Sequence, residues 1–193
     1  MMLDVSPLIR GLIFDCDGTL ADTMSQHMEA WEKAFQDVGE PYRPEFFDPL
    51  RGMNEEDIVS IYNQRYQRHL DPKELVDRKH FHFRKWPHPI EPIQPVVNLV
   101  RRYADILPMA VVSGGRHENV CQTLDSIGIR QFFSTLLTAD DPFPPKPAPD
   151  LFLEAARRLN VAPELCHVFE DGDLGLEAAR LAGMPATDVR SYL

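Results

Sequence analysis

The hydrophobic and polar residues of this chain follow two different patterns. From residue 96 onward, short apolar runs alternate with segments that carry apolar residues at helical spacing. We predict helices over residues 96–105, 116–126, 149–159 and 174–182, and strands over residues 11–15, 109–112, 134–139, 166–170 and 186–189. Strands that alternate with helices of this length predict an α/β fold, in which helices cover both faces of a parallel sheet.

Residues 25 to about 90 lack apolar runs of the strand type, and we predict that this block is helical. One helix covers residues 25–39, a second begins after Asn54 as its cap, and a third begins at Asp71 and ends near Trp86. Four prolines between residues 87 and 95 predict a linker. We therefore predict an α/β core formed by residues 1–23 and 93–193, with a helical cap domain inserted at residues 24–92.

Composition narrows the class of protein. Of the 193 residues, 44% are hydrophobic and 26% are charged, which is typical of a soluble globular chain. The sequence shows neither a transmembrane segment nor a signal peptide, and its three cysteines are few and far apart. We therefore expect a cytoplasmic protein that does not bind membranes. A formal net charge of -10 disfavours nucleic acid as a partner but allows a small phosphorylated metabolite, since a metal and a lysine can invert the field in one pocket.

The first predicted strand ends in Asp15-Cys16-Asp17-Gly18. Alternate residues of a strand point to the same face, so the two carboxylates can converge on one small volume. Like charges repel and their burial is costly, but a hard cation such as Mg2+ removes both objections. The alternative is an aspartate-rich turn that merely closes the strand.

The other strands of the predicted sheet also end in polar residues. Ser113 and two glycines follow one strand, Lys146 stands between two prolines after the next, and Glu170 and Asp171 follow the fourth. Ligands of open α/β sheets bind beyond the carboxyl ends of the strands. Carboxylates, a hydroxyl group, exposed backbone N–H groups and one cation form a set that suits phosphoryl transfer.

This combination of motifs resembles the haloacid dehalogenase superfamily over nearly the whole chain. The resemblance rests on Asp-x-Asp-Gly-Thr-Leu at residues 15–20, on Ser113, on Lys-Pro-Ala-Pro-Asp at residues 146–150 and on Phe-Glu-Asp at residues 169–171. It implies a Rossmann-like core with an inserted helical type 1 cap. Within the superfamily the chain is most similar to β-phosphoglucomutase-like proteins, and above all to bacterial fructose-1-phosphate and 6-phosphogluconate phosphatases, which share the pattern of residues 169–184 and the ending Asp188-Val189-Arg190.

The resemblance implies a phosphoric monoester hydrolase that acts on small sugar phosphates. Asp15 would be the nucleophile and would form an aspartyl-phosphate, while Asp17 would act as general acid and then as general base. Mg2+ would be held by the carboxylate of Asp15, the backbone carbonyl of Asp17 and the carboxylate of Asp171, with Glu170 binding directly or through water. Ser113 and Lys146 complete the predicted catalytic set by binding phosphate and neutralising its charge.

Further residues are predicted to bind the substrate. The resemblance assigns Thr19, Gly114, Lys146 and the cap residues His27, Arg51 and Gly52 to this group; His27 has packing within its helix as an alternative. We expect Asp173 to cap the following helix, and we expect hinges near Thr23 and Pro92.

Two other functions remain open. A sugar-phosphate mutase of the β-phosphoglucomutase type carries an arginine for the second phosphate where this chain has Glu55, and usually an apolar residue where it has Thr19, so hydrolysis is favoured. A catalytically silent binding module would be expected to lack Asp15, Asp17, Lys146 or Asp171, and all four are present. Asp17 also disfavours a dehalogenase, whose reaction does not need a second aspartate. A monomer is the default expectation.

Overall fold

The computed structural model describes residues 3–50 and 53–192, and the chain divides into two compact units. The first unit comprises Met1–Asp22 and Ile90–Leu193, and the second comprises Thr23–Pro89. The second unit is thus an insertion into the first.

A five-stranded sheet forms the centre of the first unit. Its strands lie in the order β5-β4-β1-β6-β7, and each is parallel to its neighbours. The strands are β1 (Gly11–Phe14), β4 (Met109–Val112), β5 (Thr135–Leu137), β6 (Cys166–Glu170) and β7 (Ala186–Asp188). The predicted α/β fold with a parallel sheet is therefore confirmed, although several predicted elements are one to a few residues longer than those observed.

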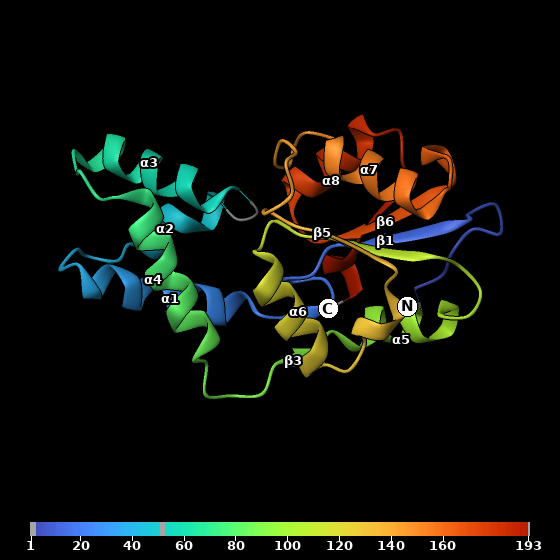
Figure 1. Ribbon diagram of the computed structural model, residues 1–193, viewed down its shortest axis with the longest axis horizontal. Helices are drawn as coiled ribbons and strands as arrows, with labels where there is room; N and C mark the ends of the chain where they lie inside the picture. The colour runs from blue at the N-terminus through green and yellow to red at the C-terminus, as the bar shows by residue number, and fades with distance from the viewer. Residues whose placement is uncertain (1–2, 51–52, 193) are drawn as a thin grey trace. The chain divides into compact units, whose positions relative to one another are not determined.

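Helices cover both faces of this sheet (Figure 1). Helices α5 (Gln94–Tyr103) and α6 (His117–Ser126) lie on one face, and α7 (Asp150–Leu159) and α8 (Asp173–Leu181) lie on the other. Leu12 and Phe14 of β1 belong to the core on the α5 side, whereas Ile13 belongs to the core on the α7 side. Both faces of β1 are buried, which explains why it is a continuous apolar run instead of an alternating one.

The predicted proline linker is only partly correct. Residues Glu91–Pro92 form strand β3, which pairs antiparallel with β2 (Ala21–Asp22). Proline is tolerated here because the ribbon has only two strands, so each has an edge that needs no ladder hydrogen bond.

The helical unit has its own apolar core. Its helices are α1 (Met24–Asp37), α2 (Pro44–Phe47), α3 (Glu55–Tyr66) and α4 (Pro72–Arg84). The core is rich in aromatic side chains, among them Trp31, Phe35, Phe46 and Tyr62. Asn54 caps α3 as predicted, since its side chain accepts hydrogen bonds from two backbone N–H groups of the first turn. The Asp71 side chain caps α4 by accepting one hydrogen bond, from the backbone N–H of Glu74. Of the helices described, none combines the length and the hydrophobicity that a membrane span requires.

Candidate active site

The side chains predicted for the core part of the site come together at one edge of the sheet. Asp15 follows β1, Ser113 follows β4, and Glu170 ends β6. These three strands are parallel neighbours, so their carboxyl ends meet at the same edge. Asp15, Ser113 and Glu170 are all buried, with exposed fractions of 7%, 1% and 3%.

Lys146 joins the ends of three strands. Its Nζ donates hydrogen bonds to Oδ1 of Asp15 at 2.7 Å, to Oε1 of Glu170 at 2.6 Å and to the carbonyl oxygen of Val112 at 3.1 Å. The side chain is 5% exposed, so it is not a solvated surface lysine. An ammonium group has three protons, and all three are used within the protein. Lys146 therefore fixes the carboxylates of Asp15 and Glu170 relative to each other.

Thr19 orients Asp171. The Thr19 hydroxyl donates to Oδ1 of Asp171 at 2.7 Å, and the Thr19 side chain is fully buried. Gly18 lies on the same side with a φ of +87°, and a Cβ there would collide with the Asp171 carboxylate. The structure thus places Thr19, predicted as a substrate-binding residue, against a predicted metal ligand.

Glu170 is held by the start of α8. The backbone N–H of Gly172 donates to Oε2 of Glu170 at 2.7 Å. A Cβ at Gly175 would collide with the Glu170 carboxylate, so glycine is required for this close approach. With Lys146 on Oε1, both carboxylate oxygens of Glu170 have protein donors.

Asp17 lies beside the loop after β4. A Cβ on Gly115 would lie 3.3 Å from Oγ of Ser113 and 3.4 Å from Oδ2 of Asp17, so the three residues are neighbours. The N–H of Gly115 donates to Oγ of Ser113 at 3.0 Å, which fixes the hydroxyl at the end of β4. Gly114 lies between them and is half-buried. The predicted phosphate-binding and acid–base groups are thus adjacent.

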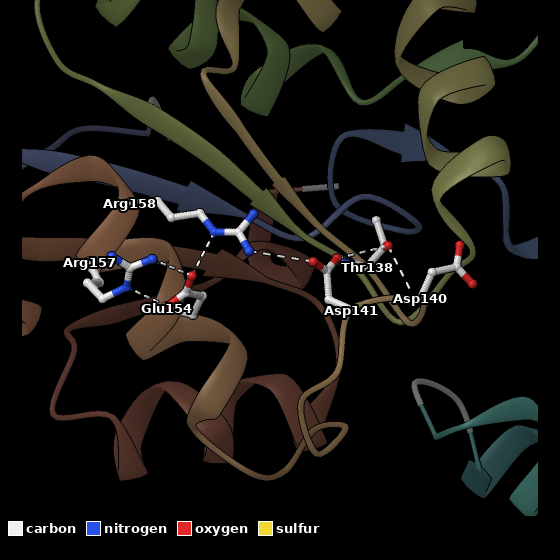
Figure 2. Close-up of polar contacts among 6 residues, drawn as sticks. All are labelled: Thr138, Asp140, Asp141, Glu154, Arg157 and Arg158. Atoms are coloured by element: carbon white, nitrogen blue, oxygen red, sulfur yellow. Dashed lines mark hydrogen bonds and ion pairs between the residues drawn. The ribbon is translucent and has the colours of Figure 1, made fainter.

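The loop that carries Lys146 is anchored to α7 (Figure 2). The backbone N–H and hydroxyl of Thr138 donate to Oδ2 of Asp141, whose Oδ1 lies 3.6 Å from Arg158 of α7. Glu154 accepts hydrogen bonds from Arg158 and Arg157 on the same helix. Asp141 therefore closes the turn after β5, and its carboxylate stabilises this loop.

The acidic cluster fits a divalent cation. Carboxylate oxygens of Asp15, Glu170 and Asp171 all lie within 4.8 Å of one another. Three carboxylates and the Lys146 ammonium carry a net charge of −2 when all are ionised, and one Mg2+ would neutralise it. Oxygen ligands and a small number of carboxylates are what Mg2+ prefers. The Asp17 carboxylate does not belong to this cluster.

The pKa values of the cluster reflect the same excess of negative charge. Burial, opposed by Lys146 and reinforced by Glu170 and Asp171, raises the pKa of Asp15 well above its usual value of 3.8. Burial, together with Glu170, raises the pKa of Asp171 from 3.8 to about 6, although Thr19 opposes the shift. A bound cation favours the ionised forms of both carboxyl groups.

The helical unit contains a second buried ionic cluster. Nζ of the fully buried Lys79 lies 2.7 Å from Nδ1 of His27 and 2.5 Å from Oε1 of Glu55. Oε2 of Glu55 lies 2.7 Å from Nε2 of His80. Burial alone would raise the pKa of Glu55, but Lys79 and His80 outweigh it and lower that pKa well below 4.5.

The predicted site residues Arg51 and Gly52 lie outside the described residues.

One expectation at the edge of the site is wrong. Asp173 does not cap α8, because Gly172 is the cap residue and Asp173 is the first residue of the helix. The Asp173 carboxylate instead accepts a hydrogen bond from Arg190 at 2.8 Å.

The buried ionic contacts of Lys79 were also not predicted from the sequence. Its signal was present, since Leu75, Lys79 and Phe83 repeat every fourth residue and place the lysine on the buried face of α4.

Comparison with known proteins identifies the family. The family model described as haloacid dehalogenase-like hydrolase matches residues 12–189. The chain is 38% identical over 181 residues to fructose-1-phosphate phosphatase YqaB of Escherichia coli (strain K12). The aligned region covers 93% of this chain and 96% of that protein. It is also 27% identical over 191 residues to beta-phosphoglucomutase of Bacillus subtilis (strain 168), covering 94% of this chain and 83% of the relative.

A solved structure shows the same fold. CbbY from Rhodobacter sphaeroides, crystallised in complex with phosphate, matches with a TM-score of 0.83 at 24% identity and covers 92% of this chain and 84% of the other. The family model and the Escherichia coli relative confirm the resemblance seen in the sequence and the expectation of an enzyme. The chain belongs to the haloacid dehalogenase-like hydrolase family.

Proposed function

We propose that this enzyme is a Mg2+-dependent phosphatase that hydrolyses phosphate monoesters of small sugars through an aspartyl-phosphate intermediate. The observation that carries the proposal is the cluster at the carboxyl edge of the sheet, in which Asp15 and Glu170 are buried and bonded to Lys146 and the half-buried Asp171 lies beside them. The Escherichia coli relative, whose name gives fructose-1-phosphate as its substrate, supports this substrate class.

In the first step, a carboxylate oxygen of Asp15 attacks phosphorus. The bond between phosphorus and the sugar oxygen breaks, and Asp17 donates a proton to that oxygen. Ser113 and the N–H of Gly114 bind the phosphate oxygens. Mg2+ would supply charge neutralisation, held by Asp15, Asp171, the backbone carbonyl of Asp17 and, directly or through water, Glu170.

In the second step, a water molecule attacks the phosphorus of the aspartyl-phosphate. Asp17, now ionised, takes a proton from that water, and the bond between phosphorus and Asp15 breaks. Inorganic phosphate is released, and Asp15 and Asp17 return to their starting states. Lys146 keeps its position throughout because three acceptors from three strands hold it.

The helical unit is proposed to be the cap that selects the substrate, with His27 and the loop that contains Arg51 and Gly52 as its contact residues. The alternative activity is that of a mutase, which the similarity to beta-phosphoglucomutase of Bacillus subtilis favours. Against it stands Glu55, an ionised acid where the mutase has an arginine for the second phosphate.

The test is phosphate release from fructose-1-phosphate, 6-phosphogluconate, β-glucose-1-phosphate and p-nitrophenyl phosphate, with Mg2+ and with EDTA. The Asp15→Asn variant is the matched control, because it keeps the shape of the nucleophile but not its charge. We expect release that requires both Mg2+ and Asp15 and is greatest on one sugar phosphate. Conversion of β-glucose-1-phosphate to glucose-6-phosphate with a bisphosphate primer would establish the mutase, and the absence of both reactions would favour a binding module.

A further inference from the structure

The last strand of the sheet is tied to the start of α8 by one arginine. Nε and Nη2 of Arg190 donate to both carboxylate oxygens of Asp188 at 2.7 to 3.1 Å, and Nη2 also donates to Oδ1 of Asp173 at 2.8 Å. Asp188 is the last residue of β7 and lies beside Glu170 in the register of the sheet. Arg190 therefore connects the carboxyl edge of the sheet to the first residue of the helix that follows the metal-binding turn.

The first turn of α8 determines where Glu170 and Asp171 lie. Gly172 donates its N–H to Glu170, and Gly175 leaves room for the Glu170 carboxylate against the helix. Asp171 stands between Glu170 and Gly172, so a shift of this turn moves both carboxylates. The cap residue Gly172 has no side chain with which to form a capping bond, and the carboxylate of Asp173 accepts from Arg190.

The backbone that carries Arg190 is anchored by its buried neighbour Val189. Val189, which precedes it, is fully buried in the core on the α5 side, while the Arg190 side chain is 48% exposed. Exposed ion pairs contribute little to global stability. The planar guanidinium nevertheless fixes direction, because its fork accommodates two carboxylates at once in a defined geometry.

We propose that Arg190 is a positioning residue for the metal-binding turn Glu170-Asp171, acting through Asp173 and Asp188. The inference rests on the proposed function in that the metal is Mg2+. Removal of Arg190 frees the first turn of α8 and weakens the binding of Mg2+, while the chemistry at saturating Mg2+ is unchanged. A lysine in its place keeps the charge but loses the fork, so its effect is intermediate.

Binding of Mg2+ to the full chain, measured by isothermal titration calorimetry, tests this directly. We expect the Kd for Mg2+ to rise about tenfold in Arg190→Ala, the lower end of the range for groups that orient metal ligands. Arg180→Ala is the matched control, since Arg180 also forms an exposed two-bond pair on α8, with Glu177, but toward the other end of the helix. Its Kd should equal that of the wild type.

Thermal unfolding in EDTA and steady-state kinetics complete the test. We expect Arg190→Ala to raise the KM for Mg2+ but to keep kcat when Mg2+ is saturating. An unchanged Kd in Arg190→Ala overturns the inference, whether or not the unfolding temperature falls. If the Kd and the unfolding temperature change together, Asp173→Ala decides, because it removes only the Asp173 arm of the bridge. A raised Kd at an unchanged unfolding temperature supports the inference, and a wild-type Kd overturns it.

The proposed function can fail separately. A wild-type enzyme that releases no phosphate, but whose Kd for Mg2+ still responds to Arg190→Ala, refutes the phosphatase and leaves the inference about the metal-binding turn in place. The inference alone is refuted if the wild-type enzyme has Mg2+-dependent phosphatase activity and the Kd for Mg2+ is unchanged in Arg190→Ala.

Discussion

Replacing Asp171 by asparagine should stabilise the metal-free protein while removing its response to Mg2+. Burial, aided by Glu170, raises the pKa of this carboxyl group from 3.8 to about 6, so the folded state resists its ionisation. The amide keeps an oxygen that can accept the Thr19 hydroxyl, at present 2.7 Å from Oδ1. The change therefore removes the charge and preserves the hydrogen bond.

The size of the effect follows from the pKa. One pKa unit corresponds to about 1.4 kcal/mol, so the difference between 3.8 and about 6 sets an upper bound of about 3 kcal/mol. Because the folded pKa is raised, the contribution of Asp171 to stability is fully present below pH 3.8 and is lost as the pH rises through about 6. At neutral pH in EDTA, we expect Asp171→Asn to increase the free energy of unfolding by about 1 to 3 kcal/mol.

Urea unfolding in EDTA and in excess Mg2+, over a range of pH, measures both effects. The gain should disappear in acid, where the wild-type carboxyl group is protonated in both states. Mg2+ should stabilise the wild type, by about 2.7 kcal/mol at one hundred times the Kd, and should barely stabilise the variant. Asp105→Asn, the same change on an exposed loop, is the control. An Asp171→Asn variant that is no more stable in EDTA than this control would refute the conclusion that the ionised Asp171 carboxylate destabilises the metal-free protein.

Three further changes test other parts of the chain. Asp15→Asn should abolish phosphate release while circular dichroism shows an unchanged fold; appreciable residual turnover would exclude Asp15 as the nucleophile. Gly175→Ala should weaken Mg2+ binding in calorimetry, because the new Cβ displaces Glu170, although alanine favours a helix by about 1 kcal/mol; a wild-type Kd would contradict this steric account. Glu55→Gln should lower the free energy of unfolding by about 3 kcal/mol in urea, because it leaves the buried Lys79 without its carboxylate, and a loss no larger than that of Glu56→Gln on the same turn would contradict this role.

Local sequence patterns were sufficient for most elements of the fold. The apolar runs that become β1 and β4 are continuous because both faces of a central parallel strand are buried, and this signal is strong in single segments. The short ribbon of β2 and β3 was missed, because two-residue strands carry no periodicity and Pro92 argues against a strand. Helix α2 is also too short for its spacing to be recognised.

The acidic residues of the strand ends show the limit of such patterns. The sequence places Asp140 and Asp141 at the edge of the sheet in the same way as Glu170 and Asp171. In the structure, Asp140 accepts a hydrogen bond from the backbone N–H of His117, and Asp141 accepts one from the backbone N–H of Thr138 in its own turn. Both carboxylates therefore stabilise loops. Residue type and position within a loop cannot distinguish a ligand from a turn former, because both are oxygen acceptors at a strand end.

The sequence by itself determined the fold class, the family and the residues around which the chemistry is proposed, because these depend on periodicity and on short motifs read within one segment. Only the tertiary structure decided which of those residues touch. Lys146 binds Asp15 across 131 positions because β1, β4 and β6 are adjacent in the sheet, and Thr19 reaches Asp171 for the same reason. Strand order and the packing of α8 against Glu170 arise from the whole core, so no local pattern encodes them.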